Sequence, residues 1–79
     1  MPSMEDKVKE LFAVMLQVSP DEISDKTSPE NVELWDSLHH LILVSGFEEE
    51  FNIDIEPEET VQMYKDFQTF KSVILQKLV

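Results

Sequence analysis

Apolar residues return every three or four positions through most of this chain, and this helical spacing is the feature that most constrains its fold. In the first such segment the apolar stripe consists of Val8, Leu11, Phe12 and Met15. Ser3 can cap the start of this helix, with Asp6 in its first turn where the helix dipole favours an anion. We expect the helix to end near Gln17, before Ser19-Pro20.

Two further segments predict a long helix and a short one. The long helix should begin at Asp36 or Ser37 and run to about Phe51. The short helix should span Glu58 to about Met63, because Pro57 suits the first turn of a helix.

A fourth helix should follow Asp66, which can cap it. Its apolar stripe consists of Phe67, Phe70, Ile74 and Leu78. A single Gly and four Pro argue against a β-sandwich or barrel, which would need many tight turns. The sequence therefore predicts one all-α domain over residues 1–79, a four-helix bundle with one long loop between helices one and two and a short third helix.

The long loop between the first two helices covers about residues 18–35. Loops of this length inside small domains are usually functional or held by their own side chains. The side chains that we expect to hold this one are Ile23, Val32, Leu34 and Trp35.

Charge is distributed unevenly along the chain. The net charge is −11, and no Lys or Arg occurs between Lys26 and Lys65, an interval with ten acidic residues. Such a surface repels nucleic acid and anionic membranes and attracts basic partners. An alternative is that the acids only keep a small protein soluble, although this does not account for one long segment without a base.

The composition of the chain argues against several other classes of protein. With no cysteine, the chain has no disulfide framework and no thiol nucleophile. Its first residues lack the features of a secretory signal, and its longest apolar run, Leu41–Val44, is too short to cross a bilayer. We expect a cytoplasmic monomer that binds neither nucleic acid nor membranes.

The histidine pair His39-His40 does not predict a metal site. Adjacent helical residues point about 100° apart, so they do not form a bidentate pair, and we expect no specific metal. We expect His40 at the edge of the core, hydrogen-bonded, and His39 in solvent. Ser37 and His40 lie about 60° apart around the helix, which disfavours a catalytic pair, and we do not expect an enzyme.

The second helix has two apolar faces. The face predicted to join the core contains Leu43, Val44, Phe47 and Phe51. The opposite face contains Leu38, Leu41, Ile42 and Ser45, followed by Glu48 and Glu49. The long loop or a second copy could cover this outer face, or it could be a surface that docks partner proteins, as exposed apolar patches often are.

Asp36 and Ser37 are both favoured helix caps, so the pair could do no more than start the helix. If Asp36 is the cap, however, the hydroxyl of Ser37 is not needed for structure. It would then lie at the positive end of a helix, which favours a phosphate group.

These residues resemble the acyl carrier proteins. The resemblance extends over essentially the whole chain, and it rests on Asp36-Ser37-Leu38, Leu43-Val44, Phe47-Glu48-Glu49-Glu50-Phe51 and Ile55. It implies that Ser37 carries a 4'-phosphopantetheine arm, transferred from coenzyme A by a phosphopantetheinyl transferase, whose thiol holds acyl groups as thioesters. It also implies partner enzymes with basic surfaces that load and transfer the acyl group. A cargo folded between helices two and three would lie near Leu43, Phe47, Ile55 and Met63.

The sequence departs from the fatty-acid-synthesis pattern at several positions. Leu34-Trp35 replaces a Gly-led approach, and His39 and Ile42 stand where acids are common. These departures indicate a discrete carrier in a specialised pathway, whose partners read apolar contact more than charge, and bulky Phe47 favours short cargo. Two alternatives remain: an aminoacyl or peptidyl carrier, and an unmodified helical adaptor that binds partners through Leu38, Leu41 and Ile42.

Overall fold

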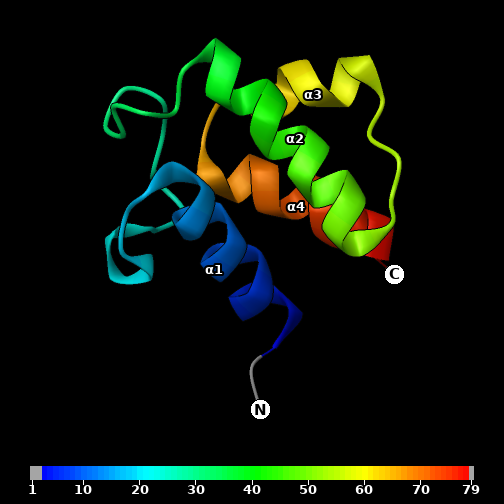
Figure 1. The fold of residues 1–79 in the computed structure, drawn as a ribbon, viewed down its shortest axis with the longest axis horizontal. Coiled ribbons are helices and arrows are strands. Elements are labelled where there is room, and N and C mark those ends of the chain that lie inside the picture. The colour runs from blue at the N-terminus through cyan, green and yellow to red at the C-terminus, as the bar shows by residue number, and fades with distance from the viewer. Residues whose placement is uncertain (1–2, 79) are drawn as a thin grey trace.

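The chain folds into helices joined by one long loop and two short connections (Figure 1). In residues 3–78, the part described by this computed structural model, the elements are α1 (Met4–Leu16), the 3-10 helix η1 (Pro20–Glu22), α2 (Ser37–Phe51), α3 (Pro57–Met63) and α4 (Phe67–Leu78). The predicted all-helical fold is confirmed. The third helix begins one residue earlier than predicted, at Pro57, and η1 was not predicted.

Local sequence explains where the helices begin and end. Ser3 and Asp6 form a reciprocal capping box at the start of α1, and Asp66 accepts the backbone N–H of Thr69 at 2.8 Å at the start of α4. α1 and α2 each end at a residue in the left-handed region, Gln17 at φ 60° and Asn52 at φ 55°. A left-handed residue of this kind stops a helix by turning the chain away from its axis.

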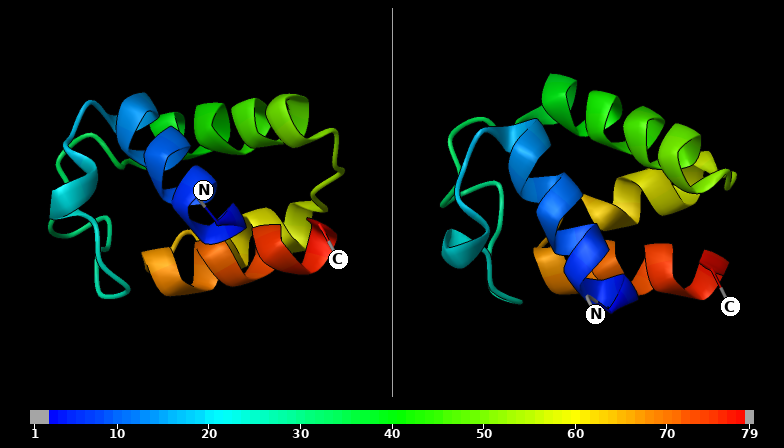
Figure 2. Two further views of the ribbon diagram at one scale, coloured as in Figure 1. Left: turned by 90° about the horizontal axis from the view of Figure 1, so that it is seen from below. Right: turned by 60° about the horizontal axis from the view of Figure 1, so that its bottom comes forward.

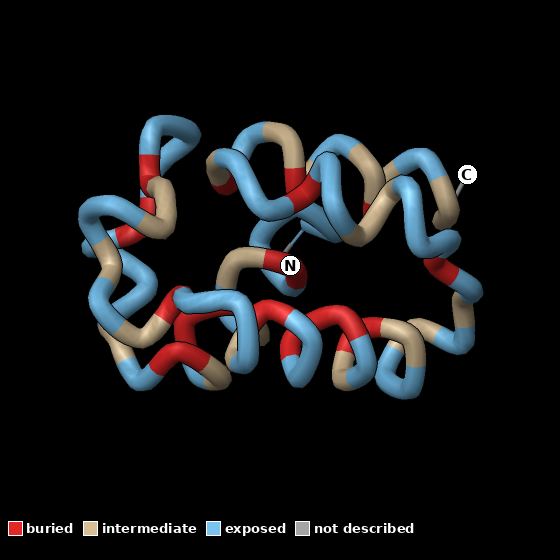
Figure 3. Tube along the Cα trace, turned by 90° about the horizontal axis from the view of Figure 1, so that it is seen from above, coloured by how far each residue is buried: buried red, intermediate tan, exposed pale blue. Residues whose placement is uncertain are grey.

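The helices enclose a single core. α1 packs against both α2 and α4, and α3 packs against α4 (Figure 2). Each of the helices α1 to α4 carries its buried residues on the side that faces the core, as the tube coloured by burial shows (Figure 3). At the centre, the ring of Phe12 lies 4.8 Å from that of Phe67 and 4.9 Å from that of Trp35. Such tilted and edge-on aromatic pairs add to the stabilisation that comes from burial alone.

The long loop is held at both of its ends by apolar side chains. Ile23 and Trp35 are buried, and Val32 and Leu34 are half-buried. In its middle, the loop caps the start of α4: the N–H of Phe67 donates to the carbonyl of Thr27 at 2.7 Å. Asp25 adds an ion pair with Lys71 at 2.8 Å. The loop therefore belongs to the packed fold and lies away from the outer face of α2.

Gly46 lets α1 and α2 approach closely. A Cβ atom at this position would lie 2.5 Å from the terminal methyl carbon of Met15. Glycine in a helix interior lowers stability by about 1 kcal/mol relative to alanine, and here its small size makes room for the Met15 side chain.

Within residues 3–78, no helix has both the length and the apolar character needed to cross a bilayer.

Candidate functional site

The cap of α2 is made by Asp36 alone. Its carboxylate accepts the backbone N–H of His39 at 2.8 Å and lies 2.9 Å from the Nδ1 atom of the His39 ring. The hydrogen bond from the His39 backbone, followed by the contact with the His39 ring, lowers the pKa of Asp36 below its usual range. The carboxylate is therefore an anion that closes the first turn of α2.

Ser37 is the first residue of α2 and is exposed. Among the described residues 3–78, the hydrogen bonds at this helix start run through Asp36 and leave the Ser37 hydroxyl out. The hydroxyl thus stands at the helix end that favours negative charge, in contact with solvent.

The outer face of α2 is uncovered in the described part of the chain. Leu38 is 64%, Leu41 59% and Ile42 51% exposed. Ser45 and Glu49 lie further along the helix and are also exposed. Within residues 3–78, the long loop does not fold over these residues. The alternative in which the loop covers the outer face of α2 therefore does not hold there.

Glu48 has a second role that the sequence did not indicate. Its carboxylate accepts the backbone N–H of Ile55 at 2.9 Å, which ties the connection after α2 back onto the helix. Glu48 is half-buried, whereas its neighbour Glu49 is exposed. Of the two acidic residues predicted to contact partners, Glu49 is therefore the one whose side chain is exposed to solvent.

A groove of about 440 Å³ runs between α2 and α3. Its lining residues are Leu41, Val44, Ser45, Glu48, Ile55, Pro57, Thr60 and Val61. Of the four residues predicted to surround a cargo, only Ile55 lines this groove. Leu43, Phe47 and Met63 lie in the core, at most 1% exposed. Val61, 76% exposed on α3, extends the apolar surface beyond what α2 alone provides.

The core beneath this groove is filled by aromatic rings. The ring of Phe47 lies 4.9 Å from that of Phe70 and 5.7 Å from that of Phe51. Protein interiors are close-packed, so a ligand could enter here only by displacing one of these rings. The open space between α2 and α3 is therefore the surface groove, which begins at Leu41, one turn after Ser37, and not the core.

A buried link that the sequence did not predict lies behind the start of α2. The indole N–H of Trp35 donates to Nδ1 of His40 at 3.0 Å, and Nε2 of His40 lies 2.7 Å from the carbonyl oxygen of Thr60. His40 was expected at the edge of the core and is instead buried, 3% exposed. The contact with Thr60 depends on the position of α3 beside α2, which the sequence does not reveal. Trp35 and His40, by contrast, lie five residues apart in the sequence.

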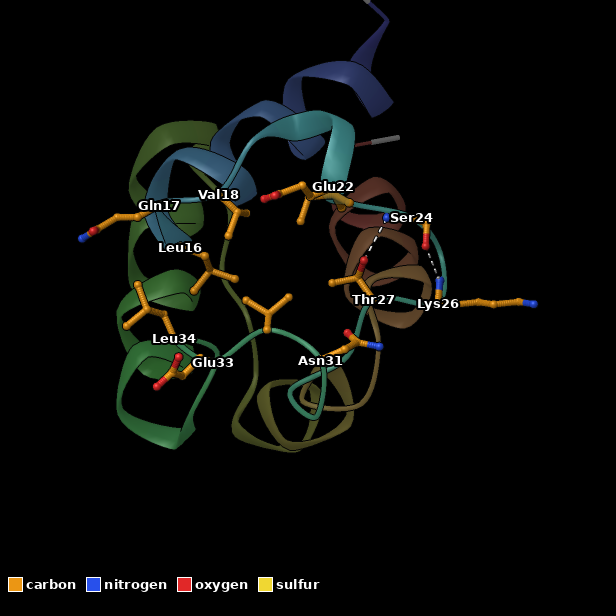
Figure 4. A pocket seen from close by; sticks show the side chains of 12 residues that line it. Leu16, Gln17, Val18, Glu22, Ser24, Lys26, Thr27, Asn31, Glu33 and Leu34 are labelled. Carbon is orange, nitrogen blue, oxygen red and sulfur yellow. Dashed lines mark hydrogen bonds between the residues drawn. The ribbon is translucent and has the colours of Figure 1, made fainter.

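A second hollow, of about 570 Å³, lies between the end of α1 and the long loop (Figure 4). Its aliphatic lining comes from Leu16, Val18, Ile23, Val32 and Leu34. Ser24 and Thr27 lie at its rim, where the Ser24 N–H donates to the Thr27 hydroxyl at 2.9 Å. This hydrogen bond within the loop forms part of the wall of the hollow and adds no reactive group to it.

Within residues 3–78, no cluster of three or more histidine or acidic side chains is arranged to hold a metal ion. Comparison with protein-family models finds no match to this chain. Comparison with curated proteins finds no match either.

Proposed function

We propose that this protein is a carrier whose Ser37 hydroxyl bears a 4'-phosphopantetheine arm and that it delivers acyl intermediates to partner enzymes. One observation carries the proposal: an exposed serine hydroxyl follows a complete aspartate cap and borders an uncovered apolar face. A helix start needs one capping side chain, so the hydroxyl of Ser37 is left free for another purpose. The acyl-carrier-like bundle, with its long loop and short α3, is part of the same proposal.

Electrostatics at the helix start supports a phosphodiester on Ser37. The first backbone N–H groups of a helix point outward and favour an anion. Asp36 occupies only the N–H of His39, so the preceding N–H groups of the first turn remain for a phosphate oxygen. Ser37 Oγ would form the ester bond to phosphorus, with the 3',5'-ADP part of coenzyme A as the leaving group.

The docking surface in this proposal is the outer face of α2, namely Leu38, Leu41, Ile42, Ser45, Glu48 and Glu49, extended by Val61 of α3. A phosphopantetheinyl transferase would meet it first, followed by enzymes that load and remove the acyl group. The apolar residues lie next to Ser37 and the acids one to two turns further along. We therefore expect partners with an apolar contact opposite Leu41 and basic residues opposite Glu49.

The cargo is expected to be short. The thioester would lie at the far end of the arm, and an arm folded back along α2 would bring it to the groove between α2 and α3, whose lining includes Val44, Ile55 and Val61. A longer chain would need space that Phe47 and Phe70 already fill. The surface groove suits a short acyl group better than a long chain held inside the bundle. We therefore propose a role in specialised or fatty-acid-related biosynthesis.

Two other functions are tied to particular observations. An aminoacyl or peptidyl carrier would use the same serine, and the groove, which includes Ser45 and Thr60 beside its apolar residues, does not separate these cargoes. An unmodified adaptor would use only the apolar face, which is exposed whether or not Ser37 is modified.

The test is intact mass after incubation with coenzyme A, Mg²⁺ and a promiscuous phosphopantetheinyl transferase. The wild type should gain the mass of one phosphopantetheine, and Ser37→Ala should gain none. Ser72→Ala is the matched control, because Ser72 is also an exposed serine on a helix but lies on α4, outside the docking surface, and this variant should still be modified. Absence of an adduct on the folded wild type would leave the adaptor as the better account.

A further inference from the structure

A buried imidazole joins three parts of the fold immediately behind the Ser37 helix start. Nδ1 of His40 faces the indole N–H of Trp35 in the long loop, at 3.0 Å. Nε2 faces the backbone carbonyl of Thr60 in α3, at 2.7 Å. Trp35 and His40 are 1% and 3% exposed, so water does not compete for either contact.

The two partners determine which nitrogen of the ring carries the proton. An indole N–H can only donate, so Nδ1 must be the acceptor and bears no proton. A carbonyl oxygen can only accept, so Nε2 must bear the proton and donate it to Thr60. The ring is therefore neutral, with both nitrogens satisfied.

A second proton on this ring could only go to Nδ1, where it would point at the indole N–H. Two donors would then face each other in a buried site, and the Trp35 hydrogen bond would be lost. The Thr60 bond would remain, because Nε2 keeps its proton. Protonation thus breaks one of the two links and spares the other.

The other groups around the ring do not offset the added charge. Tyr64 packs on it with ring centroids 4.9 Å apart, and a phenol is uncharged in acid. From α4, the apolar ring of Phe70 lies 6.1 Å away. The acids next to the latch residues in the sequence have other partners: Asp36 pairs with His39, and Glu59 pairs with Lys77.

We propose that His40 is a pH-sensitive latch: acid breaks its bond to Trp35 and loosens the segment before Ser37, while its bond to Thr60 keeps α2 on α3. The segment in question is residues 34–36, which includes the cap Asp36. Burial lowers the pKa of His40 below its ordinary 6.5, although the Thr60 carbonyl opposes this shift. The latch therefore opens below the pH at which a free histidine titrates and stays closed at neutral pH. It does not depend on modification of Ser37.

Trp35 is the single tryptophan of the chain, so one indole N–H signal in an NMR spectrum of the unmodified protein reports on the latch. As the pH falls from about 7.5 to about 4.5, this signal should shift along a single titration curve with a midpoint below that of a free histidine. Its protection from exchange, taken relative to a free indole at the same pH, should fall roughly tenfold, which corresponds to one lost buried hydrogen bond. An indole signal that stays constant over this range would overturn the proposal.

Two variants separate the latch from general acid effects. His40→Asn keeps an acceptor near the Nδ1 position but cannot titrate, so its indole signal should lose the titration step. If this variant does not fold, Trp35→Phe provides the second test, because it removes the opposing donor. Urea midpoints of Trp35→Phe should fall less between about pH 7.5 and about pH 5 than those of the wild type. Equal falls in the two proteins, or the same titration in His40→Asn as in the wild type, would contradict the latch.

Discussion

The carboxylate of Asp36 holds both the backbone N–H and the ring Nδ1 of His39, at 2.8 and 2.9 Å, and thereby closes the first turn of α2 without using Ser37. Ser37 is therefore the first residue of the helix, but its hydroxyl takes no part in the cap. A cap that fixes the backbone at the start of α2 also fixes the direction in which the Cβ atom of Ser37 leaves the helix.

The cap leads to a prediction about acid stability. Because hydrogen bonds from His39 lower the pKa of Asp36 in the folded state, the carboxylate stabilises the fold above the unfolded-state value of 3.8. This contribution is lost as the pH falls through the lower, folded-state pKa. Asp36→Asn keeps a capping oxygen without a titrating group and should show a smaller loss of stability in strong acid.

Urea midpoints at neutral and acidic pH measure the effect. Asp36→Ala, which lacks the cap, should have a lower midpoint than Asp36→Asn at neutral pH. Identical midpoints for these two variants would show that the cap contributes nothing.

The outer face of α2 predicts a variant that loses partners but keeps its fold. Leu41 is 59% exposed, so Leu41→Asp should change the free energy of unfolding by no more than about 0.5 kcal/mol. It should lower kcat/KM for modification by the transferase by about tenfold, the effect of losing one apolar anchor at an interface. Steady-state kinetics and thermal melts measure the two quantities.

Val14 supplies the matched control for this variant. It is a large apolar residue that is 70% exposed on α1, away from the proposed docking surface. Val14→Asp should leave kcat/KM unchanged. Equal losses in both variants would mean that added charge, and not the α2 face, governs recognition.

The close approach at Gly46 predicts a coupling between two substitutions. Alanine at this position should gain about 1 kcal/mol of helix stability, but its Cβ would meet the end of the Met15 side chain. In a Met15→Ala background the conflict is absent, and Gly46→Ala should be more stabilising than in the wild type. A double-mutant cycle in urea measures this difference. The same effect in both backgrounds would contradict the close contact between Gly46 of α2 and Met15 of α1.

The groove between α2 and α3 predicts which residues change their NMR signals when a cargo is attached. A short acyl group on the arm of Ser37, with the arm folded back along α2, should shift NMR signals of groove residues such as Val44, Thr60 and Val61. Signals from Leu43 and Met63, which are buried in the core, should move little. A carrier that shields a long acyl chain would instead shift the core signals as the chain grows, and that result would overturn the expectation of short cargo.

The features that the sequence predicted well are local ones. Ser3 and Asp66 cap helices through atoms three residues away, so their roles follow from nearby residues alone. The outer face of α2 followed from periodicity, because Leu38, Leu41 and Ile42 share one side of an isolated helix.

The features that the sequence did not predict depend on contacts between elements. Val61 joins the apolar surface only because α3 lies against the groove, and Thr60 reaches His40 only through the same placement. For a cargo pocket, the resemblance to the acyl carrier proteins pointed to the inner residues Leu43 and Phe47. It could not show that aromatic rings from α4 fill the space beside them.

The central claim is that Ser37, and no other serine, carries the arm. Trypsin should cut after Lys26 and Lys65 and release residues 27–65, a peptide that holds Ser28, Ser37 and Ser45. After the loading reaction, fragment masses of this peptide measure which serine is modified. We predict that the phosphopantetheine mass lies on Ser37 alone. A modification on Ser28 or Ser45, or an unmodified peptide from a folded protein under conditions that load a known carrier, would contradict the account.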